Sequence, residues 1–113
     1  MLQSLPFEGT IRVRNKGVDI TILADVDTVD LAFRASRTLV VCGISTAVLE
    51  ITCFDPIDTR TLEYYEKNTP CLLAMTSRIA DAVIPCLKHD TRLQRFDGKG
   101  ETELIQAVRR IVR

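Results

Sequence analysis

The sequence predicts one α/β domain, residues 1–113, with a mostly parallel sheet and helices on both faces of that sheet. Two observations lead to this prediction. From residue 38 onward, short apolar runs typical of buried strands alternate with segments in which apolar residues recur every three or four positions, as they do in helices. Such alternation is typical of parallel sheets, because each helix carries the chain back to the start of the next strand. A length of 113 residues suits a single domain with its own hydrophobic core.

The N-terminal part of the chain contains two predicted strands. Residues 10–14 alternate apolar and charged side chains, and residues 18–24 continue a strand pattern. Residues 15–17, Asn-Lys-Gly, favour a turn between them. We therefore expect an N-terminal β-hairpin.

The next segment is predicted to form one helix and two buried strands. Asp27 or Thr28 can cap the helix, since both side chains can accept hydrogen bonds from amides of the first turn. Residues 38–43 and 48–54 are continuous apolar runs. Runs of this kind are typical of parallel strands that are covered on both faces.

The C-terminal half alternates between helices and strands. Asp55 as N-cap and Pro56 as the first helical residue predict a helix after the second buried strand. A strand follows at residues 71–75, and Thr76 is placed to cap a helix that Pro85 should kink or shorten. The last two predicted elements are a short strand and an amphipathic helix, residues 92–96 and 101–112.

Charge and composition exclude several classes of function. The 15 basic and 15 acidic residues cancel, whereas a nucleic-acid-binding protein usually has a basic surplus. The clustered Arg109, Arg110 and Arg113 support a separate hypothesis, an accessory role in nucleic-acid binding. No run approaches the roughly 20 apolar residues of a membrane span, and the first residues do not resemble a signal peptide. We expect a cytoplasmic protein that binds neither nucleic acid nor membrane.

The cysteines are predicted to be buried free thiols in a reducing compartment. None has C-x-x-C spacing, and most lie inside apolar runs, where free cysteine behaves as a small hydrophobic residue. The chain has one histidine, His89, so no metal cluster and no cofactor are expected. The four cysteines are Cys42, Cys53, Cys71 and Cys86.

Candidate binding residues gather where the predicted strands end. In parallel sheets, ligands bind beyond the carboxyl ends of the strands, so we expect a binding site there and no catalytic residues. Carboxylate and hydroxyl oxygens at this edge could hold Mg²⁺, and the same side chains could equally serve as helix caps. The candidate residues are Asp25, Asp27, Asp55, Thr76 and Arg95.

An alternative function uses the loop that begins at Cys42. Cys42-Gly43-Ile44-Ser45-Thr46 is similar to loops whose backbone amides hold a phosphate beside a nucleophilic thiolate. A phosphatase of this kind would need an arginine where this chain has Val48. The alternative hypothesis is therefore a small phosphocarrier or enzyme that uses Cys42 or the sheet-edge carboxylates.

Residues 48–113 resemble the second half of a response-regulator receiver domain. The likeness lies in four stretches: Val48 to Pro56, Thr69 to Ser77, Leu93 to Phe96 and Glu103 to Ile111. In such domains the first stretch carries the phosphoacceptor aspartate and the third carries a lysine.

This chain departs from the receiver pattern at both functional positions. Thr52 stands where the acceptor aspartate is expected, and Gln94 or Arg95 stands at the lysine position. The resemblance implies a flavodoxin-like, receiver-like fold and a pseudo-receiver. Its function would be that of a non-enzymatic regulatory domain in signal transduction. It would bind a protein partner or itself, either as a stand-alone protein or as part of a larger regulatory protein.

Overall fold

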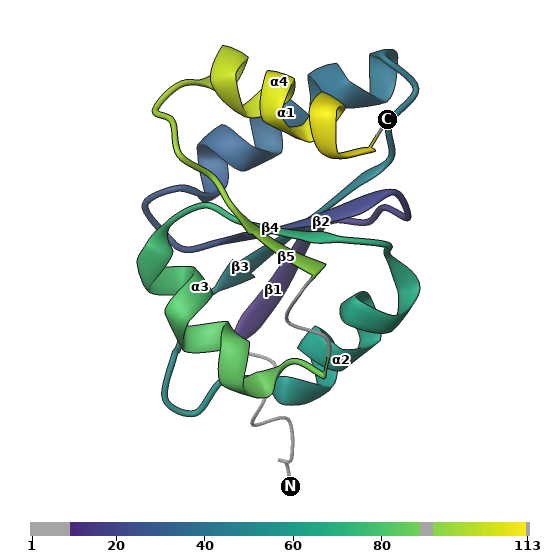
Figure 1. The fold of residues 1–113 in the computed structure, drawn as a ribbon. Coiled ribbons are helices and arrows are strands. Elements are labelled where there is room, and N and C mark those ends of the chain that lie inside the picture. The colour runs from purple at the N-terminus through teal and green to yellow at the C-terminus, as the bar shows by residue number, and fades with distance from the viewer. Residues whose placement is uncertain (1–9, 89–91, 113) are drawn as a thin grey trace, which may run out of the picture.

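The computed structural model describes residues 10–88 and 92–112. They form a five-stranded sheet with two helices on each face (Figure 1). In chain order the elements are β1 (Ile11–Asn15), β2 (Ile20–Ala24), α1 (Val29–Val41), β3 (Thr46–Ile51), α2 (Thr59–Asn68), β4 (Leu72–Ala74), α3 (Ser77–Val83), the 3-10 helix η2 (Ile84–Cys86), β5 (Leu93–Arg95) and α4 (Glu101–Val112).

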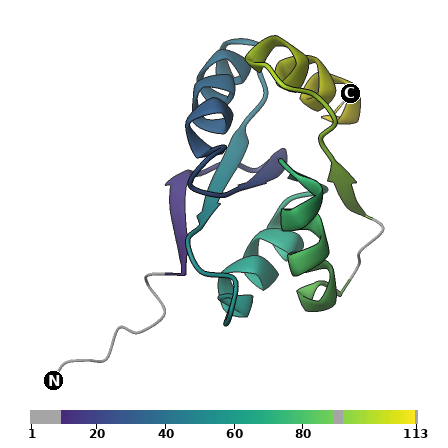
Figure 2. The same ribbon diagram turned by 90° about the vertical axis from the view of Figure 1, so that its left-hand side faces the viewer.

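The sheet has the order β1-β3-β2-β4-β5, and four of its strands are parallel. Helices α1 and α4 cover one face, while α2 and α3 cover the other (Figures 1 and 2). β2 lies at the centre, and all five of its residues are buried. The predicted α/β architecture with a mostly parallel, flavodoxin-like sheet is confirmed.

The two N-terminal strands form a hairpin whose two arms are separated by another strand. β1 and β2 follow one another and run in opposite directions, but β3 lies between them and pairs with both. The hydrogen-bonded partner of β1 is therefore β3, with Ile11 opposite Ile51. The connection from β1 to β2 passes the start of β3, where a Cβ on Gly17 would lie 2.3 Å from the carbonyl carbon of Thr46. Only glycine allows this close approach of two backbones.

Residues 38–41 are helical, so the predicted strand at residues 38–43 is wrong. α1 continues to Val41, and its buried residues recur at helical spacing as far as Leu39. Gly43, with φ of +85°, ends the helix. The Gly43 amide donates to the carbonyl of Val40, and the Ile44 amide donates to that of Leu39. This pair of bonds is a Schellman motif, which satisfies the last helical carbonyls. The burial of one helical face outweighed the strand preference of the β-branched run.

Helix α2 begins at Thr59, so the prediction that Asp55 caps it is wrong. Asp58 is the N-cap, and its Oδ1 accepts a hydrogen bond from the Thr61 amide at 3.2 Å. The Thr61 hydroxyl donates to the other oxygen of the same carboxylate. Asp55 lies exposed in a turn with Pro56. Both aspartates suit a cap, and the second hydrogen bond from Thr61 favours Asp58.

Asp58→Ala should lower the free energy of unfolding by about 1–2 kcal/mol, because the variant loses the cap of α2. Asp55→Ala should change it by less than about 0.5 kcal/mol, since Asp55 is exposed and caps no helix. Urea denaturation of both variants measures the difference. A larger loss for Asp55→Ala than for Asp58→Ala would contradict this assignment of the cap.

The remaining C-terminal elements agree with the sequence patterns. Thr76 Oγ1 accepts a hydrogen bond from the Ile79 amide at 3.1 Å and caps α3. α3 ends at Val83, and Pro85 lies in the short 3-10 helix that follows. α4 runs from Glu101 to Val112. These features depend on neighbouring residues, which is why local sequence predicts them.

Candidate functional site

Asp25 closes the turn between β2 and α1. Its side chain is buried, and Oδ1 accepts hydrogen bonds from the Asp27 amide at 3.1 Å, the Thr28 amide at 3.0 Å and the Thr28 hydroxyl at 2.8 Å. The Thr28 hydroxyl in turn accepts from the Asp25 amide at 3.0 Å. Asp27 is exposed beside it. The sheet-edge position of Asp25 is as predicted, and its carboxylate supports the start of α1.

A cavity of about 480 Å³ opens at the carboxyl ends of β2 and β3. The guanidinium of Arg78 lies 5.0 Å from the centre of the Phe54 ring, close enough for a cation–π contact. Buried Glu50 pairs with Arg14 at 2.9 Å. The lining therefore contains both cationic and anionic side chains. The lining residues are Arg12, Asp25, Val26, Asp27, Glu50, Ile51, Thr52, Phe54 and Arg78.

The five predicted site residues do not converge on one point. Asp25 and Asp27 line the carboxyl-edge cavity, whereas Arg95 forms an ion pair with Asp81 at 3.2 Å and lines a different cavity. Asp55 and Thr76 line neither. Over residues 10–88 and 92–112, no three His, Cys, Asp or Glu side chains lie close enough to hold a metal ion.

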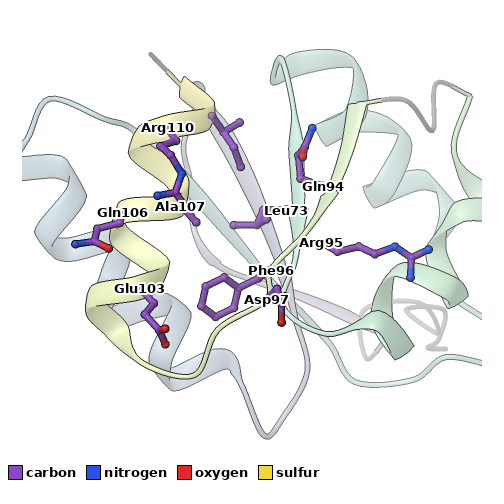
Figure 3. Close-up of a pocket in the computed structure, with 10 residues that line it drawn as sticks. Leu73, Gln94, Arg95, Phe96, Asp97, Glu103, Gln106, Ala107 and Arg110 are labelled. Atoms are coloured by element: carbon purple, nitrogen blue, oxygen red, sulfur yellow. The ribbon is translucent and has the colours of Figure 1, made fainter.

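The cavity that Arg95 lines lies between β5 and α4, with a volume of about 330 Å³ (Figure 3). Gln106 and Arg110 reach it from α4, and Phe96 enters it from the end of β5. The Arg95 side chain extends away from α4. This cavity is polar, and sequence reasoning did not single it out. The lining residues are Leu73, Gln94, Arg95, Phe96, Asp97, Glu103, Gln106, Ala107, Arg110 and Ile111.

Glu103 stabilises the first turn of α4. One carboxylate oxygen accepts hydrogen bonds from the amides of Lys99, at 2.7 Å, and Gly100, at 3.1 Å. These two bonds favour the charged form and hold the pKa of Glu103 below its usual value. The stabilisation is therefore present above the ordinary carboxyl pKa and is lost as the pH falls through the lowered value.

The prediction that all four cysteines are buried is wrong. Cys42 is exposed at the end of α1, and the other three are half-buried. Burial raises the pKa of the Cys71 thiol. Cys42 lies at the amino end of the sheet, before β3, whereas Asp25 and Asp27 lie at the carboxyl end. The thiol and the sheet-edge carboxylates therefore cannot belong to one site. His89 and Arg113 lie outside the described residues.

No protein-family model matches this sequence, and no curated protein matches it. Solved structures do match. The chain superposes on a structure described as a split gene transketolase, inactive beta4 tetramer, with a TM-score of 0.79 and 20% identity. It superposes on 2-oxoglutarate:ferredoxin oxidoreductase from Magnetococcus marinus with a TM-score of 0.80 and 10% identity. For transketolase from Campylobacter jejuni the TM-score is 0.65 and the identity 11%.

The likeness covers nearly all of this chain and a minor part of each enzyme. It spans 92% of this chain and 41% of the split gene transketolase chain. The corresponding values are 96% and 21% for the oxidoreductase, and 91% and 19% for the Campylobacter transketolase. At these identities the likeness shows the fold. The chain has the fold of one part of these larger enzymes.

The resemblance to receiver domains is wrong, and so is the signalling function it implied. The structural neighbours are transketolase and oxidoreductase domains. The likeness over residues 48–113 has a general cause: in a parallel α/β sheet every helix starts near the carboxyl end of a strand, where Asp, Ser and Thr are favoured as caps. Thr76 is such a cap. Capping residues at strand ends therefore do not distinguish these families.

Proposed function

We propose that this chain is a domain or small subunit of a larger enzyme of the transketolase or 2-oxoglutarate:ferredoxin oxidoreductase type. The observation that carries the proposal is the unequal coverage of the structural matches. They include 92% and 96% of this chain but 41% and 21% of those proteins. A complete enzyme of this type would need further domains or subunits beside these 113 residues.

Within such an enzyme, the chain would support an active site that other parts provide. Two of its carboxylates at the carboxyl edge already have structural partners: Asp25 holds the turn into α1, and Glu50 pairs with Arg14. The described residues contain no cluster of three His, Cys, Asp or Glu side chains that could hold a metal ion. Among the described residues, no helix is long and apolar enough to cross a membrane.

A second candidate role is the binding of a small polar molecule at the carboxyl-edge cavity. Asp25 and Asp27 line this cavity together with Arg12 and Arg78, at the edge where α/β sheets usually bind ligands. A ligand that carries both an anionic and a cationic group would match these side chains. The other predicted binding residues, Asp55, Thr76 and Arg95, do not line this cavity.

The test is isolation of the protein that carries these residues, tagged at its own genomic locus, under native conditions. We expect it in a particle well above the 12.7 kDa of this chain, with transketolase or 2-oxoglutarate:ferredoxin oxidoreductase activity enriched over an untagged control. The recombinant 113-residue chain alone should show neither activity. Recovery of a 12.7-kDa species without either activity would overturn the proposal.

A further inference from the structure

Helices α1 and α4 end side by side, with exposed apolar side chains at the end of α1 and half-buried ones, Ile44 and Val112, nearby. The two helices pack together on one face of the sheet and run in the same direction (Figures 1 and 2). Val40 is 63% exposed, Val41 is 86% exposed, and Cys42 is also exposed. We call Val40, Val41, Cys42, Ile44 and Val112 the helix-end surface.

The local structure does not need these apolar side chains. Leu39 anchors the end of α1 in the core, whereas Val40 and Val41 point into solvent. β-branched residues favour helices less than most polar residues do, so valine gives this helix no advantage. Single exposed apolar residues such as Val26 are common on protein surfaces. A group of neighbouring ones is typical of an interaction surface.

The helix-end surface has a basic border and a hollow. A cavity of about 510 Å³ lies between the two helix ends, lined by Cys42, Ile44, Gln106, Arg109, Arg110 and Val112. Among the residues that the structure describes, no acidic side chain lines it. Arg37 is exposed one turn earlier on α1. Neither Arg109 nor Arg110 forms an ion pair with another described residue. A partner that covers this surface must therefore neutralise positive charge.

The charge disfavours a second copy of this chain as that partner. A two-fold contact places the same surface on both sides, so both sides would carry Arg109 and Arg110, and neither lining includes a described acidic side chain to neutralise them. Like charges facing one another across an interface cost several kcal/mol. The hollow also suits an inserted side chain better than the broad, flat surface of a bilayer.

We propose that the helix-end surface binds a segment of a partner protein in which apolar side chains are flanked by Asp or Glu. The apolar side chains would enter the hollow beside Ile44 and Val112, and the carboxylates would pair with Arg109 and Arg110. Resting on the proposed function, this inference assigns the segment to another domain or subunit of the same enzyme. The contact would also bury Val40 and Val41, which are exposed to water in the chain alone.

A library of random 16-residue peptides displayed on phage, selected on the native chain, tests this directly. We expect enriched sequences in which Leu, Ile or Phe lies beside Asp or Glu. A synthetic peptide with an enriched sequence should bind at least tenfold more weakly to the Val41→Asp and Arg110→Glu variants than to the parent chain. Val26→Asp is the matched control, because Val26 is 72% exposed at the opposite end of the sheet. This variant should bind the peptide as tightly as the parent chain does. Thermal unfolding verifies that each variant is folded.

Three outcomes would overturn the inference. The first is enrichment of peptides that lack acidic residues, or of peptides whose binding is unaffected by Val41→Asp. The second is a dimer in sedimentation velocity that Val41→Asp dissociates. The third is Val41-dependent binding to phosphatidylserine vesicles in place of peptides.

The same variants separate this inference from the proposed function. If the tagged parent protein and its Val41→Asp variant co-isolate enzyme activity equally, the surface is misassigned and the proposed function stands. If peptides bind the surface but no enzyme activity accompanies the protein, the proposed function fails, and the surface serves another acidic partner.

Discussion

Gly17→Ala should lower the free energy of unfolding by about 3 kcal/mol or more, a large share of the roughly 5–15 kcal/mol that stabilises a domain. A Cβ at this position would meet three backbone atoms of β3: the Thr46 carbonyl carbon at 2.3 Å, the Ala47 nitrogen at 2.4 Å and the Thr46 nitrogen at 2.7 Å. Backbone in a central strand cannot rotate away as a side chain can. The strand or the connection must shift, and overpacking of this kind costs about 1–3 kcal/mol even where flexible side chains absorb it.

Gly100→Ala provides the control for this experiment. A Cβ on Gly100 would meet nothing within 4 Å, so this variant should lose less than about 1 kcal/mol. Urea denaturation of the parent and both variants gives the comparison. Equal stability of Gly17→Ala and the parent would mean that the β1–β2 connection does not cross the start of β3 as described.

Leu39→Ala should cost about 2–5 kcal/mol, whereas Val41→Ala should change stability by less than about 0.5 kcal/mol. Leu39 is fully buried in the core and is the last buried residue of α1, while Val41 lies in solvent. If residues 38–43 formed a strand, positions 39 and 41 would share a face, and both substitutions would have similar effects. The pair therefore distinguishes helix from strand.

Val40→Ala completes that test. In a helix it should behave like Val41→Ala, because Val40 is also exposed. Guanidinium denaturation monitored by circular dichroism gives the three free energies under one condition. Comparable losses at Leu39 and Val41 would contradict the helical assignment of this segment.

The candidate site could be predicted from the sequence only in part. Asp25, Asp27 and Thr76 do lie at the carboxyl ends of strands, because strand periodicity fixes where each strand ends. Which of these residues share a cavity depends on strand order. β1, β3 and β2 lie next to one another in the sheet, so Asp25 and Asp27 line the same cavity as Arg12 and Arg78. Arg95 is on edge strand β5 and lines a different cavity. No local pattern contains this information.

The helix-end surface was hidden from sequence reasoning for a related reason. An apolar run that includes Val40, Val41 and Cys42 is usually buried, and the sequence alone predicts it as a core strand. The structure shows the run divided between a buried Leu39 and exposed neighbours. The earlier residues of α1 bury one face at helical spacing, and this continuous contact with the sheet carries the helix through residue 41.

By itself, the sequence determined the α/β class, the C-terminal helix α4, the Thr76 cap and the shortening of α3 at Pro85. Each depends on periodicity, capping or backbone geometry within a few residues. Tertiary structure alone decided that β3 separates β1 from β2 and that Cys42 is exposed. These outcomes depend on which distant segments pack together, and the free energy of that burial exceeds the local preferences of the residues involved.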